Sequence, residues 1–373
     1  MNAQRAEVVI IGGGILGCTI AYYLVKSGVV PMVVEANALG SGASGLALGG
    51  LDPTGGAGIP GPLGPLARES LWLHQELHSQ LVEDTGVDNG FHMISHLTIA
   101  LGESEALNLK KQVTLKSSNQ FPTKWLSPEQ IRHLEPHITP KVSGALQTDG
   151  VAMLDSESHM KALATGLKQN GVRIEIASLE GIEWSGRKVS GVSLSTGRVA
   201  AETVILAIGP WSGMLSGWLG TSIPIKPLKG QIIRLRTEEP KFYNYASRNG
   251  MYVAAKRDGL IWAGTTEEDV GFNTEVTDTA RQHILRNARD ILPALDSGTI
   301  VKQTACLRPL SEDGLPILGS IPNTEGVYIA TGGGRKGIEL SAGMSAAIVD
   351  IVTNNSTVLP IADLGLDRFE RLT

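Results

Sequence analysis

Residues 7–17 read EVVIIGGGILG, and this stretch decides the fold class. The short, β-branched run at residues 7–11 predicts a buried strand that ends at Gly12. Residues 15–26 then predict a helix, and residues 30–35 predict a second buried strand. Because strand–turn–helix–strand units cross over right-handed and place their strands parallel, the stretch predicts a Rossmann-like domain of the α/β class.

Three glycines of this stretch, Gly12, Gly14 and Gly17, satisfy the pattern G-x-G-x-x-G. The pattern is weak alone, but here it follows a strand, opens a helix and is followed about 20 residues later by Glu35, which ends the next strand. The helix N-terminus favours a pyrophosphate, and Glu35 can accept hydrogen bonds from both ribose hydroxyls, which disfavours NADP. The motif leaves NAD and FAD open, and a glycine turn without a ligand is the structural alternative.

The bulk composition excludes several classes of protein. The 373 residues carry a net charge of −5, which argues against a general nucleic-acid binder. Only Cys18 and Cys306 are present, so a disulfide framework is excluded and a cytoplasmic location fits. No stretch reaches the roughly 20 apolar residues of a spanning helix, and no histidine spacing indicates a metal site. No Ser/His/Asp or Cys/His triad stands out in the sequence.

The remaining elements predict two interleaved domains, α+β overall. Antiparallel strands are expected at residues 229–236, 251–256 and 260–266, with a hairpin turn at Arg257-Asp258-Gly259. Buried strands of the α/β type recur near residues 203–207 and 327–331. We therefore expect an FAD- or NAD-binding domain of residues 1–88, 147–222 and 302–373, and a smaller antiparallel substrate domain of residues 89–146 and 223–301.

Four segments resemble one known family, the FAD-dependent amine and amino-acid oxidoreductases of the D-amino-acid oxidase type. They are the N-terminal VVIIGGGILGCTIAYYLVKSG, GSGASGLALGG at 40–50, TVILAIGPWSGML at 203–215, and the C-terminal pair CLRPLSEDGLPILG and TGGGRKGIELSAG. The chain looks closest to the glycine oxidase branch, with sarcosine oxidase and D-amino-acid dehydrogenase as relatives. Because FAD is longer than NAD, it needs contacts from several separate segments.

The resemblance implies a set of FAD-binding positions spread over the chain. The first turn and the end of the second strand would hold the ADP half, the 40–51 loop the pyrophosphate and the isoalloxazine ring, and the last helix the flavin pyrimidine ring. The positions are Gly12, Gly14, Ile15, Leu16, Gly17, Glu35, Ala36, Gly42, Ala43, Ser44, Gly49, Gly50, Leu51, Leu179, Gly209, Trp211, Gly334, Arg335, Lys336, Gly337 and Ile338.

The resemblance also implies a substrate site. Arg308 and Tyr252 match the residues that fix the substrate carboxylate in relatives, and a guanidinium suits this role because its planar fork binds a carboxylate bidentately. Arg335 is a third catalytic candidate, near the flavin and the pocket mouth. Glu267 could hold the substrate ammonium, although a solvated strand end is the simpler interpretation. The structural alternatives are an ion pair for Arg308 and a half-buried strand aromatic for Tyr252.

Three features depart from the family or stay open. Cys306 matches the position at which sarcosine oxidases attach FAD through a thioether, but its surroundings resemble the non-covalent branch, so we expect non-covalent FAD. Gly333 and Gly334 replace bulkier residues of glycine oxidase, which suggests a roomier pocket. The Pro- and Gly-rich loop 51–64 has no assigned role.

The expected reaction is oxidation of a small amino acid or an N-substituted glycine. Arg308 and Tyr252 would clamp the carboxylate, hydride would pass from Cα to flavin N5, and the imine would hydrolyse to an oxo acid and ammonia or an amine. Oxygen or a quinone would take the electrons, and a homo-oligomer stays open. The rival interpretations are an FAD-dependent 2-hydroxy-acid dehydrogenase, an NAD-dependent reductase, and a non-catalytic FAD-binding subunit of a larger oxidoreductase complex.

Overall fold

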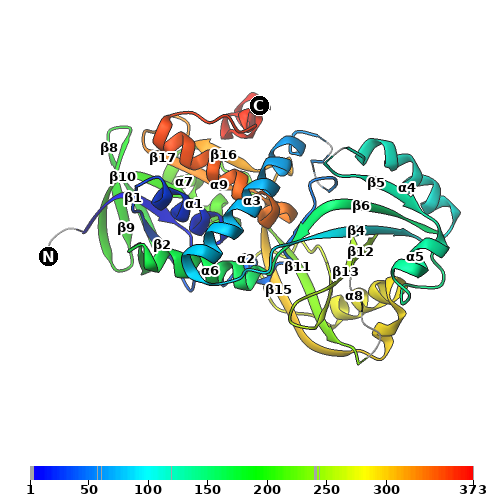
Figure 1. Ribbon diagram of the computed structural model, residues 1–373. Coiled ribbons are helices and arrows are strands. Elements are labelled where there is room, and N and C mark those ends of the chain that lie inside the picture. Colours follow the sequence, from blue (N-terminus) through cyan, green and yellow to red (C-terminus); the bar gives the residue numbers. More distant parts are fainter. Residues whose placement is uncertain are drawn as a thin grey trace.

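Two sheets divide the strands of the protein. The computed structural model describes residues 4–56, 58–59, 61–118, 120–238, 242 and 244–372. In Figure 1 one sheet, which contains β1, β10 and β17, lies at the left, and the other, which contains β4, β6 and β11, lies farther right. The helices pack on and around the two sheets. Among the described residues the sheets hold eight and nine strands.

The first sheet is mainly parallel and follows the order β16-β17-β10-β1-β2-β7, with β9 joined to β10 and β8 joined to β9. Strand β1 lies at its centre, parallel to both β10 and β2. The strands are β1 (Gln4–Ile11), β2 (Met32–Glu35), β7 (Arg173–Ile176), β8 (Leu179–Ser185), β9 (Lys188–Leu194), β10 (Gly197–Leu206), β16 (Ile317–Ser320) and β17 (Val327–Thr331).

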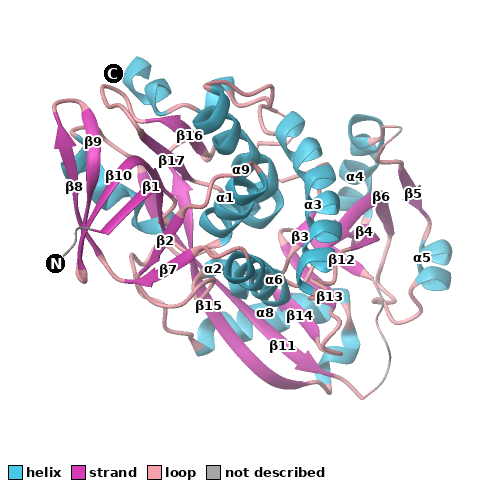
Figure 2. Ribbon diagram, turned by 60° about the vertical axis from the view of Figure 1, so that its left-hand side comes forward, coloured by secondary structure: helices cyan, strands magenta, loops and turns pink. Residues whose placement is uncertain are grey.

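Four helices share one core with a face of this sheet: α1 and α9 contact the strands, and α3 and α6 pack against those two helices. In Figure 2, α1 and α9 lie beside the parallel strands, and α3 and α6 lie beyond them, toward the second sheet. They are α1 (Ile15–Lys26), α3 (Gly64–Thr85), α6 (Ser156–Gln169) and α9 (Gly337–Asn354). Helix α1 is apolar nearly all round because it is enclosed between the sheet and α9, whereas α3 ends at Gly86 in the left-handed conformation that favours glycine.

The second sheet is mainly antiparallel and follows the order β15-β11-β14-β13-β12-β4-β6-β3, with β5 joined to β6. The pair β12 and β4 is parallel. The strands are β3 (Gly50–Leu51), β4 (His92–Ala100), β5 (Thr123–Leu126), β6 (Gly144–Met153), β11 (Ile225–Arg236), β12 (Tyr245–Arg248), β13 (Met251–Ala255), β14 (Ile261–Gly264) and β15 (Thr299–Ser311).

The second sheet has two different faces. One face packs against the amphipathic helix α8 (Asp278–Ile291) in a core of aliphatic side chains. The other face carries a small cluster that includes Met153, Ile232 and Trp262 and is joined by Leu48 from the loop before β3. Because Leu48 comes from the segment that links the two sheets, this second face looks toward the parallel sheet.

The remaining helical segments lie at the ends and edges of the sheets. They are α2 (Ala43–Leu46), α4 (Glu103–Lys116), α5 (Pro128–Leu134), α7 (Ser216–Leu219) and the 3₁₀ turns η1 (Gly209–Leu215), η2 (Pro293–Asp296), η3 (Gly334–Lys336), η4 (Ala362–Leu364) and η5 (Leu366–Leu372). In the described part of the chain, no helix combines the length and the apolar character needed to cross a membrane.

The expected combination of a Rossmann-like parallel sheet and an antiparallel sheet is confirmed, but the antiparallel sheet is not the smaller one, since it has nine described strands against eight. The chain passes repeatedly between the two sheets, since β3 to β6 and β11 to β15 are inserted between strands of the parallel sheet. The expected domain boundaries at 147 and 302 fall within β6 and β15, which both belong to the second sheet. The division of the whole chain into domains stays a prediction.

Candidate active site

The glycine motif lies at the carboxyl edge of the parallel sheet, between β1 and α1. Gly12 has φ +109°, and a Cβ there would lie 2.3 Å from the carbonyl oxygen of Ala207. A Cβ on Gly17 would lie 1.8 Å from the carbonyl oxygen of Gly12. Both glycines are therefore required by backbone contacts that a side chain would prevent. Helix α1 begins next to them without a side-chain cap, so its first N–H groups face the sheet edge.

Glu35 ends β2 at the same edge and is fixed by the backbone. One carboxylate oxygen accepts a hydrogen bond from the N–H of Gly13 at 2.7 Å, and the other accepts from the N–H of Asn37 at 2.9 Å. Each oxygen retains a further acceptor site, which is what two neighbouring ribose hydroxyls require. The 40–44 loop reaches the same place, since Ser44 Oγ accepts from the N–H of Ile15 at 2.8 Å.

Gly49 connects this edge to the second sheet. It has φ +84°, and a Cβ there would lie 2.2 Å from the carbonyl oxygen of Leu154. The next two residues, Gly50 and Leu51, form β3 and pair with the end of β6. The predicted isoalloxazine-facing segment is therefore held by backbone hydrogen bonds at the junction of the two sheets.

The other predicted cofactor positions lie after strands of the parallel sheet. Leu179 begins β8, two residues after Ala177, whose N–H donates to the carbonyl oxygen of Glu35. Gly209 follows β10, and a Cβ there would have no heavy atom within 4 Å. Trp211 is 45% exposed and stacks on Phe272 with ring centroids 5.9 Å apart, so its indole is on the surface.

The segment from Gly334 to Ile338 follows β17 and opens α9. Helix α9 has no side-chain cap, and a Cβ on Gly337 would have no heavy atom within 4 Å. Two helix N-termini whose N-cap residues provide no side-chain cap, a fixed carboxylate and glycines with free space thus lie along one edge. These features fit a long anionic cofactor with a ribose end and a flat ring end, as FAD is.

Arg308 lies on β15, on the face of the second sheet that looks toward the parallel sheet. One of its Nη atoms donates to Thr265 Oγ1 at 2.7 Å, and the other donates to the carbonyl oxygen of Thr266 at 3.2 Å. The guanidinium lies flat over Gly230, where a Cβ would come within 2.1 Å of it. No carboxylate of the described residues forms an ion pair with Arg308, so its charge is available to an acidic ligand.

Tyr252 lies on β13, on the same face of the second sheet as Arg308. Its hydroxyl lies over Gly264 of the neighbouring strand β14. Burial raises its pKa, and the nearby positive charge of Arg308 partly opposes this rise. Tyr245 on the neighbouring strand β12 packs edge-on against Tyr252, with ring centroids 6.3 Å apart. Neither hydroxyl has a hydrogen-bond partner among the described residues. The structure therefore brings together a guanidinium and two neutral hydroxyl donors.

Arg335 is engaged differently from Arg308. Its guanidinium forms a two-point ion pair with the carboxylate of Glu267, in the segment that follows β14. The sequence suggested separate roles for these two residues, one near the flavin and the other at the substrate ammonium. In the structure their charges compensate each other, and the side chain of Arg335 is 54% exposed.

Cys306 lies two residues before Arg308 and opposite Gly230. The thiol is buried and free, and burial raises its pKa. Because the thiolate is the reactive form of cysteine, burial makes this side chain a poor nucleophile. No group of three or more His, Cys, Asp or Glu side chains in the described part of the chain could hold a metal ion.

Sequence reasoning missed a hydrogen-bonded chain on the same face of the sheet. Asp52 follows β3, His96 lies on β4 and Ser247 lies on β12. His96 Nδ1 is 2.7 Å from Asp52 Oδ2, and His96 Nε2 is 2.7 Å from Ser247 Oγ. These residues are 44 and 151 positions apart in the chain, so the sequence carried no local signal for them.

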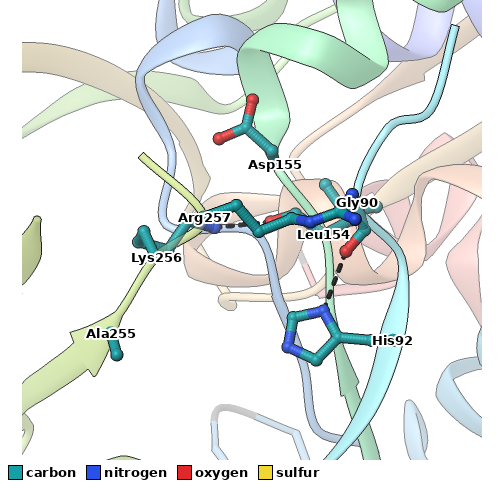
Figure 3. A pocket seen from close by; sticks show the side chains of 7 residues that line it. All are labelled: Gly90, His92, Leu154, Asp155, Ala255, Lys256 and Arg257. Atoms are coloured by element: carbon teal, nitrogen blue, oxygen red, sulfur yellow. Dashed lines mark hydrogen bonds between the residues drawn. The ribbon is translucent and has the colours of Figure 1, made fainter. Parts of the chain in front are cut away.

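Lys256 fastens the segment before Gly49 to the second sheet. Its ammonium donates to the carbonyl oxygens of Leu48 at 2.8 Å and Leu154 at 2.6 Å, and burial lowers its pKa to about 8. Figure 3 shows Lys256 beside Leu154 in a cavity of about 10 Å³ that is also lined by Asp155, Arg257 and His92. This volume holds about one water molecule, so the cavity is a packing feature and not the substrate site.

Comparisons with known proteins show the family of the chain. The family described as FAD dependent oxidoreductase matches residues 7–351. The chain belongs to this family. It is 30% identical over 370 residues to a glycine oxidase of Geobacillus kaustophilus, with 98% of this chain and 97% of the relative covered.

Solved structures of the FAD-dependent family show the same fold. A crystal structure of glycine oxidase from Geobacillus kaustophilus superposes with a TM-score of 0.93 at 28% identity, covering 98% of this chain and 99% of that one. A crystal structure of iminodiacetate oxidase from Chelativorans sp. BNC1 superposes with a TM-score of 0.89 at 22% identity, covering 96% and 98%, and at that identity it shows the fold alone. This protein is therefore an enzyme of an FAD-dependent amino-acid oxidoreductase family.

Proposed function

We propose that this enzyme oxidises a small amino acid or an N-substituted glycine and releases an oxo acid with ammonia or an amine. The observation that carries the proposal is the pairing of Arg308, whose charge no described carboxylate compensates, with the unpartnered hydroxyl of Tyr252 on the face that looks toward the FAD edge. A guanidinium with a neutral hydroxyl beside it suits a carboxylate, since both are donors. The glycine oxidase relatives support an amino-acid substrate.

In the proposed reaction Arg308 and Tyr252 bind and orient the substrate carboxylate. Gly230 and Gly264 let both side chains lie flat on the sheet, because a Cβ at either position would collide with them. Bound FAD supplies the two-electron acceptor for the hydride that leaves Cα. The apolar side chains of Met153, Ile232 and Trp262 on the same face limit access of water. Positioning and exclusion of water are the contributions of this chain.

The carboxylate clamp is tested with the variants Arg308→Ala and Arg308→Lys. A hydrogen bond to a charged group contributes about 1.5–3 kcal/mol, so we expect KM to rise by about 10- to 150-fold in Arg308→Ala and by less in Arg308→Lys, which retains the charge but not the fork. Both variants are expected to keep FAD. Arg257→Ala, on the exposed hairpin of the same sheet, is the control. An unchanged KM in Arg308→Ala would show that the clamp lies elsewhere.

We further propose that FAD is held without a covalent bond. A thioether at Cys306 needs the thiolate, and burial of this side chain favours the thiol. After acid precipitation of the purified enzyme, we expect the flavin in the supernatant. Flavin that stays with the protein pellet in the parent enzyme, and leaves it in Cys306→Ser, would establish the thioether instead.

A further inference from the structure

Arg335 and Glu267 form an ion pair that joins the two sheets next to the proposed carboxylate clamp. Arg335 belongs to η3, which follows β17 of the parallel sheet, and Glu267 belongs to the segment that follows β14 of the second sheet. The Nε atom of Arg335 pairs with one carboxylate oxygen of Glu267, and an Nη atom donates to the other oxygen. The planar guanidinium thus holds Glu267 in the two-point geometry with which it would hold the carboxylate of a ligand.

One short segment of the chain leads from the clamp to this pair. Thr265 Oγ1 and the carbonyl oxygen of Thr266 accept hydrogen bonds from the guanidinium of Arg308, at 2.7 and 3.2 Å. Glu267 is the next residue, and consecutive Cα atoms are about 3.8 Å apart. The backbone that orients Arg308 therefore also positions the carboxylate that holds Arg335.

Arg335 reaches the same place from the parallel sheet. The preceding residue, Gly334, has φ +50°, and a Cβ there would lie 3.9 Å from the carbonyl oxygen of Pro309, which follows Arg308 in β15. The whole turn η3 packs against β15. Both members of the pair are therefore one residue away from groups that contact Arg308 or its neighbour Pro309, although they come from different sheets.

The exposure of the pair leaves it open to a charged ligand. The side chains of Arg335 and Glu267 are 54% and 34% exposed. Opening a buried ion pair is costly, because each charge would be left without a partner in a medium of low polarity. An exposed pair is weak, since water solvates both charges, so its members can exchange partners when a competing charge is brought close.

The acidic residues that follow Glu267 have cations of their own. Glu268 pairs with Lys229 at 3.1 Å, and Asp269 pairs with Lys226 at 2.7 Å. Arg308 has no such partner in the described part of the chain. The mouth of the site is thus balanced in charge, and the one uncompensated cation matches a substrate with a single carboxylate.

Resting on the proposed amino-acid oxidation, we propose that the Arg335–Glu267 pair selects substrates by the charge of their side chain or N-substituent, and that Glu267 excludes dicarboxylates by compensating Arg335. A second substrate carboxylate must take Arg335 from Glu267, and the released carboxylate then repels it. An extra substrate ammonium must likewise displace Arg335 from Glu267. A neutral group disturbs neither charge, so the pair favours amino acids and N-substituted glycines whose remaining groups are uncharged.

The test uses three variants of the pair in the FAD-loaded enzyme. Glu267→Gln leaves Arg335 as a second free cation, Arg335→Gln leaves Glu267 as a free anion, and the double variant has neither charge. Glu202→Gln and Arg5→Gln are the matched controls, because they break an exposed Arg–Glu pair between the starting half of β1 and β10, away from the glycine motif. Each comparison is made between ligands within one variant, so a general loss of affinity does not affect it.

The first measurement is binding without turnover. α-Aminoisobutyrate, α-methylaspartate and α-methylornithine have no hydrogen on Cα, so they bind without being oxidised, and their side chains are neutral, acidic and basic. Their dissociation constants are measured from the change that they cause in flavin absorption. Because a hydrogen bond to a charged group contributes about 10-fold or more, we expect the affinity for α-methylaspartate relative to α-aminoisobutyrate to rise about 10-fold in Glu267→Gln. We expect a similar relative gain for α-methylornithine in Arg335→Gln.

The double variant and added salt distinguish charge selection from a structural role of the pair. The double variant is expected to return both affinity ratios to near the parent values, although it has lost the ion pair. Salt is expected to reduce the gains of the single variants, since the charges are exposed. Affinity ratios that stay at the parent values in both single variants, including a failure of all three ligands to bind, would overturn the inference. Equal gains in the control variants would overturn it too.

Turnover separates this inference from the proposed function. Anaerobic flavin reduction is compared for iminodiacetate and sarcosine, and for aspartate and alanine in both enantiomers. If amino acids bleach the flavin of the parent enzyme but Glu267→Gln does not improve any acidic substrate relative to its neutral counterpart, the charge selection is wrong and amino-acid oxidation stands. If no amino acid or amine bleaches the flavin of the parent enzyme, the proposed function is wrong, and this inference is overturned with it.

Discussion

At the scale of single residues, the proposed site depends on an arginine whose charge no described carboxylate neutralises. The guanidinium of Arg308 is held by a threonine hydroxyl and a carbonyl oxygen, which orient it without neutralising its charge. By contrast, Arg335 is paired with Glu267. Arg308 and Arg335 were both candidates from the sequence, but only the charge of Arg308 is left free to bind an acidic ligand.

Tyr252→Phe tests the hydroxyl half of the clamp. The ring stays in place, so we expect normal folding and normal FAD content, with a KM about 10-fold higher or more because one hydrogen bond to a carboxylate is lost. Steady-state kinetics with the best substrate measures the effect. Tyr22→Phe removes a hydroxyl that donates to Asp84 far from the site and serves as the control. Equal kinetics in the two variants would remove Tyr252 from the clamp.

From two buried histidines we predict how the free energy of unfolding depends on pH. Burial lowers the pKa of His74 to about 4 and that of His159 to about 3. Above pH 6.5 both are neutral in the folded and the unfolded states. As the pH falls below 6.5, the unfolded state binds protons that the folded state does not, so the free energy of unfolding decreases by up to about 1.4 kcal/mol per pH unit for each histidine.

Urea unfolding at neutral and mildly acidic pH measures this dependence. We expect the decrease toward acid pH to be smaller in His159→Gln than in the parent protein, because one of the two groups is removed. His283→Gln, on helix α8 of the other sheet, is the control and is expected to keep the parent slope. A parent-like slope in His159→Gln would place the acid sensitivity elsewhere.

At the scale of elements, close backbone approach positions the cofactor edge. Helix α1 contacts β1 so closely that Gly17 touches the carbonyl of Gly12, and the loop before β3 contacts the end of β6 through Gly49. Both contacts need glycine. They fix where the first helix N-terminus and the segment predicted to face the flavin lie relative to the two sheets.

Gly17→Ala tests this packing. The added methyl group forces α1 away from β1, and we expect a loss of about 1–3 kcal/mol of stability together with loss of bound FAD. Gly217→Ala is the matched control, because a Cβ there has no heavy atom within 4 Å. FAD content per protein and the melting temperature report the outcome. A Gly17→Ala variant with parent levels of both would show that α1 tolerates a shift.

At the scale of the whole molecule, the sequence predicted the parallel half better than the antiparallel half. Residues 7–35 carry local signals for strand, turn, helix and strand, and the structure has β1, α1 and β2 there. The sequence analysis missed strands β4 and β6, because their apolar and polar residues do not alternate regularly and their partner strands lie far away in the chain. The Asn249-Gly250 turn, with both φ angles positive, could have revealed β12 and with it Tyr245.

Site residues that belong to a family motif could be predicted from the sequence. Contacts that arise only from the pairing of distant strands could not. Arg308 and Tyr252 were predicted by resemblance to bind the substrate carboxylate, and the structure places them on one face of the second sheet. The Asp52–His96–Ser247 chain depends on β4 lying beside β12 and on the path of the loop after β3. Such contacts follow from the tertiary arrangement alone, so neither composition nor spacing could indicate them.

We propose that bound FAD is reduced by an amino acid whose carboxylate is held by Arg308. The most direct measurement is the visible spectrum of the purified enzyme, recorded anaerobically while glycine, sarcosine, D-amino acids and N-substituted glycines are added one at a time. We predict a flavin spectrum that is bleached by at least one of them, with little bleaching of Arg308→Ala at the same concentration. A colourless protein that does not take up FAD, or a flavin that every amine leaves oxidised while 2-hydroxy acids bleach it, would contradict the account.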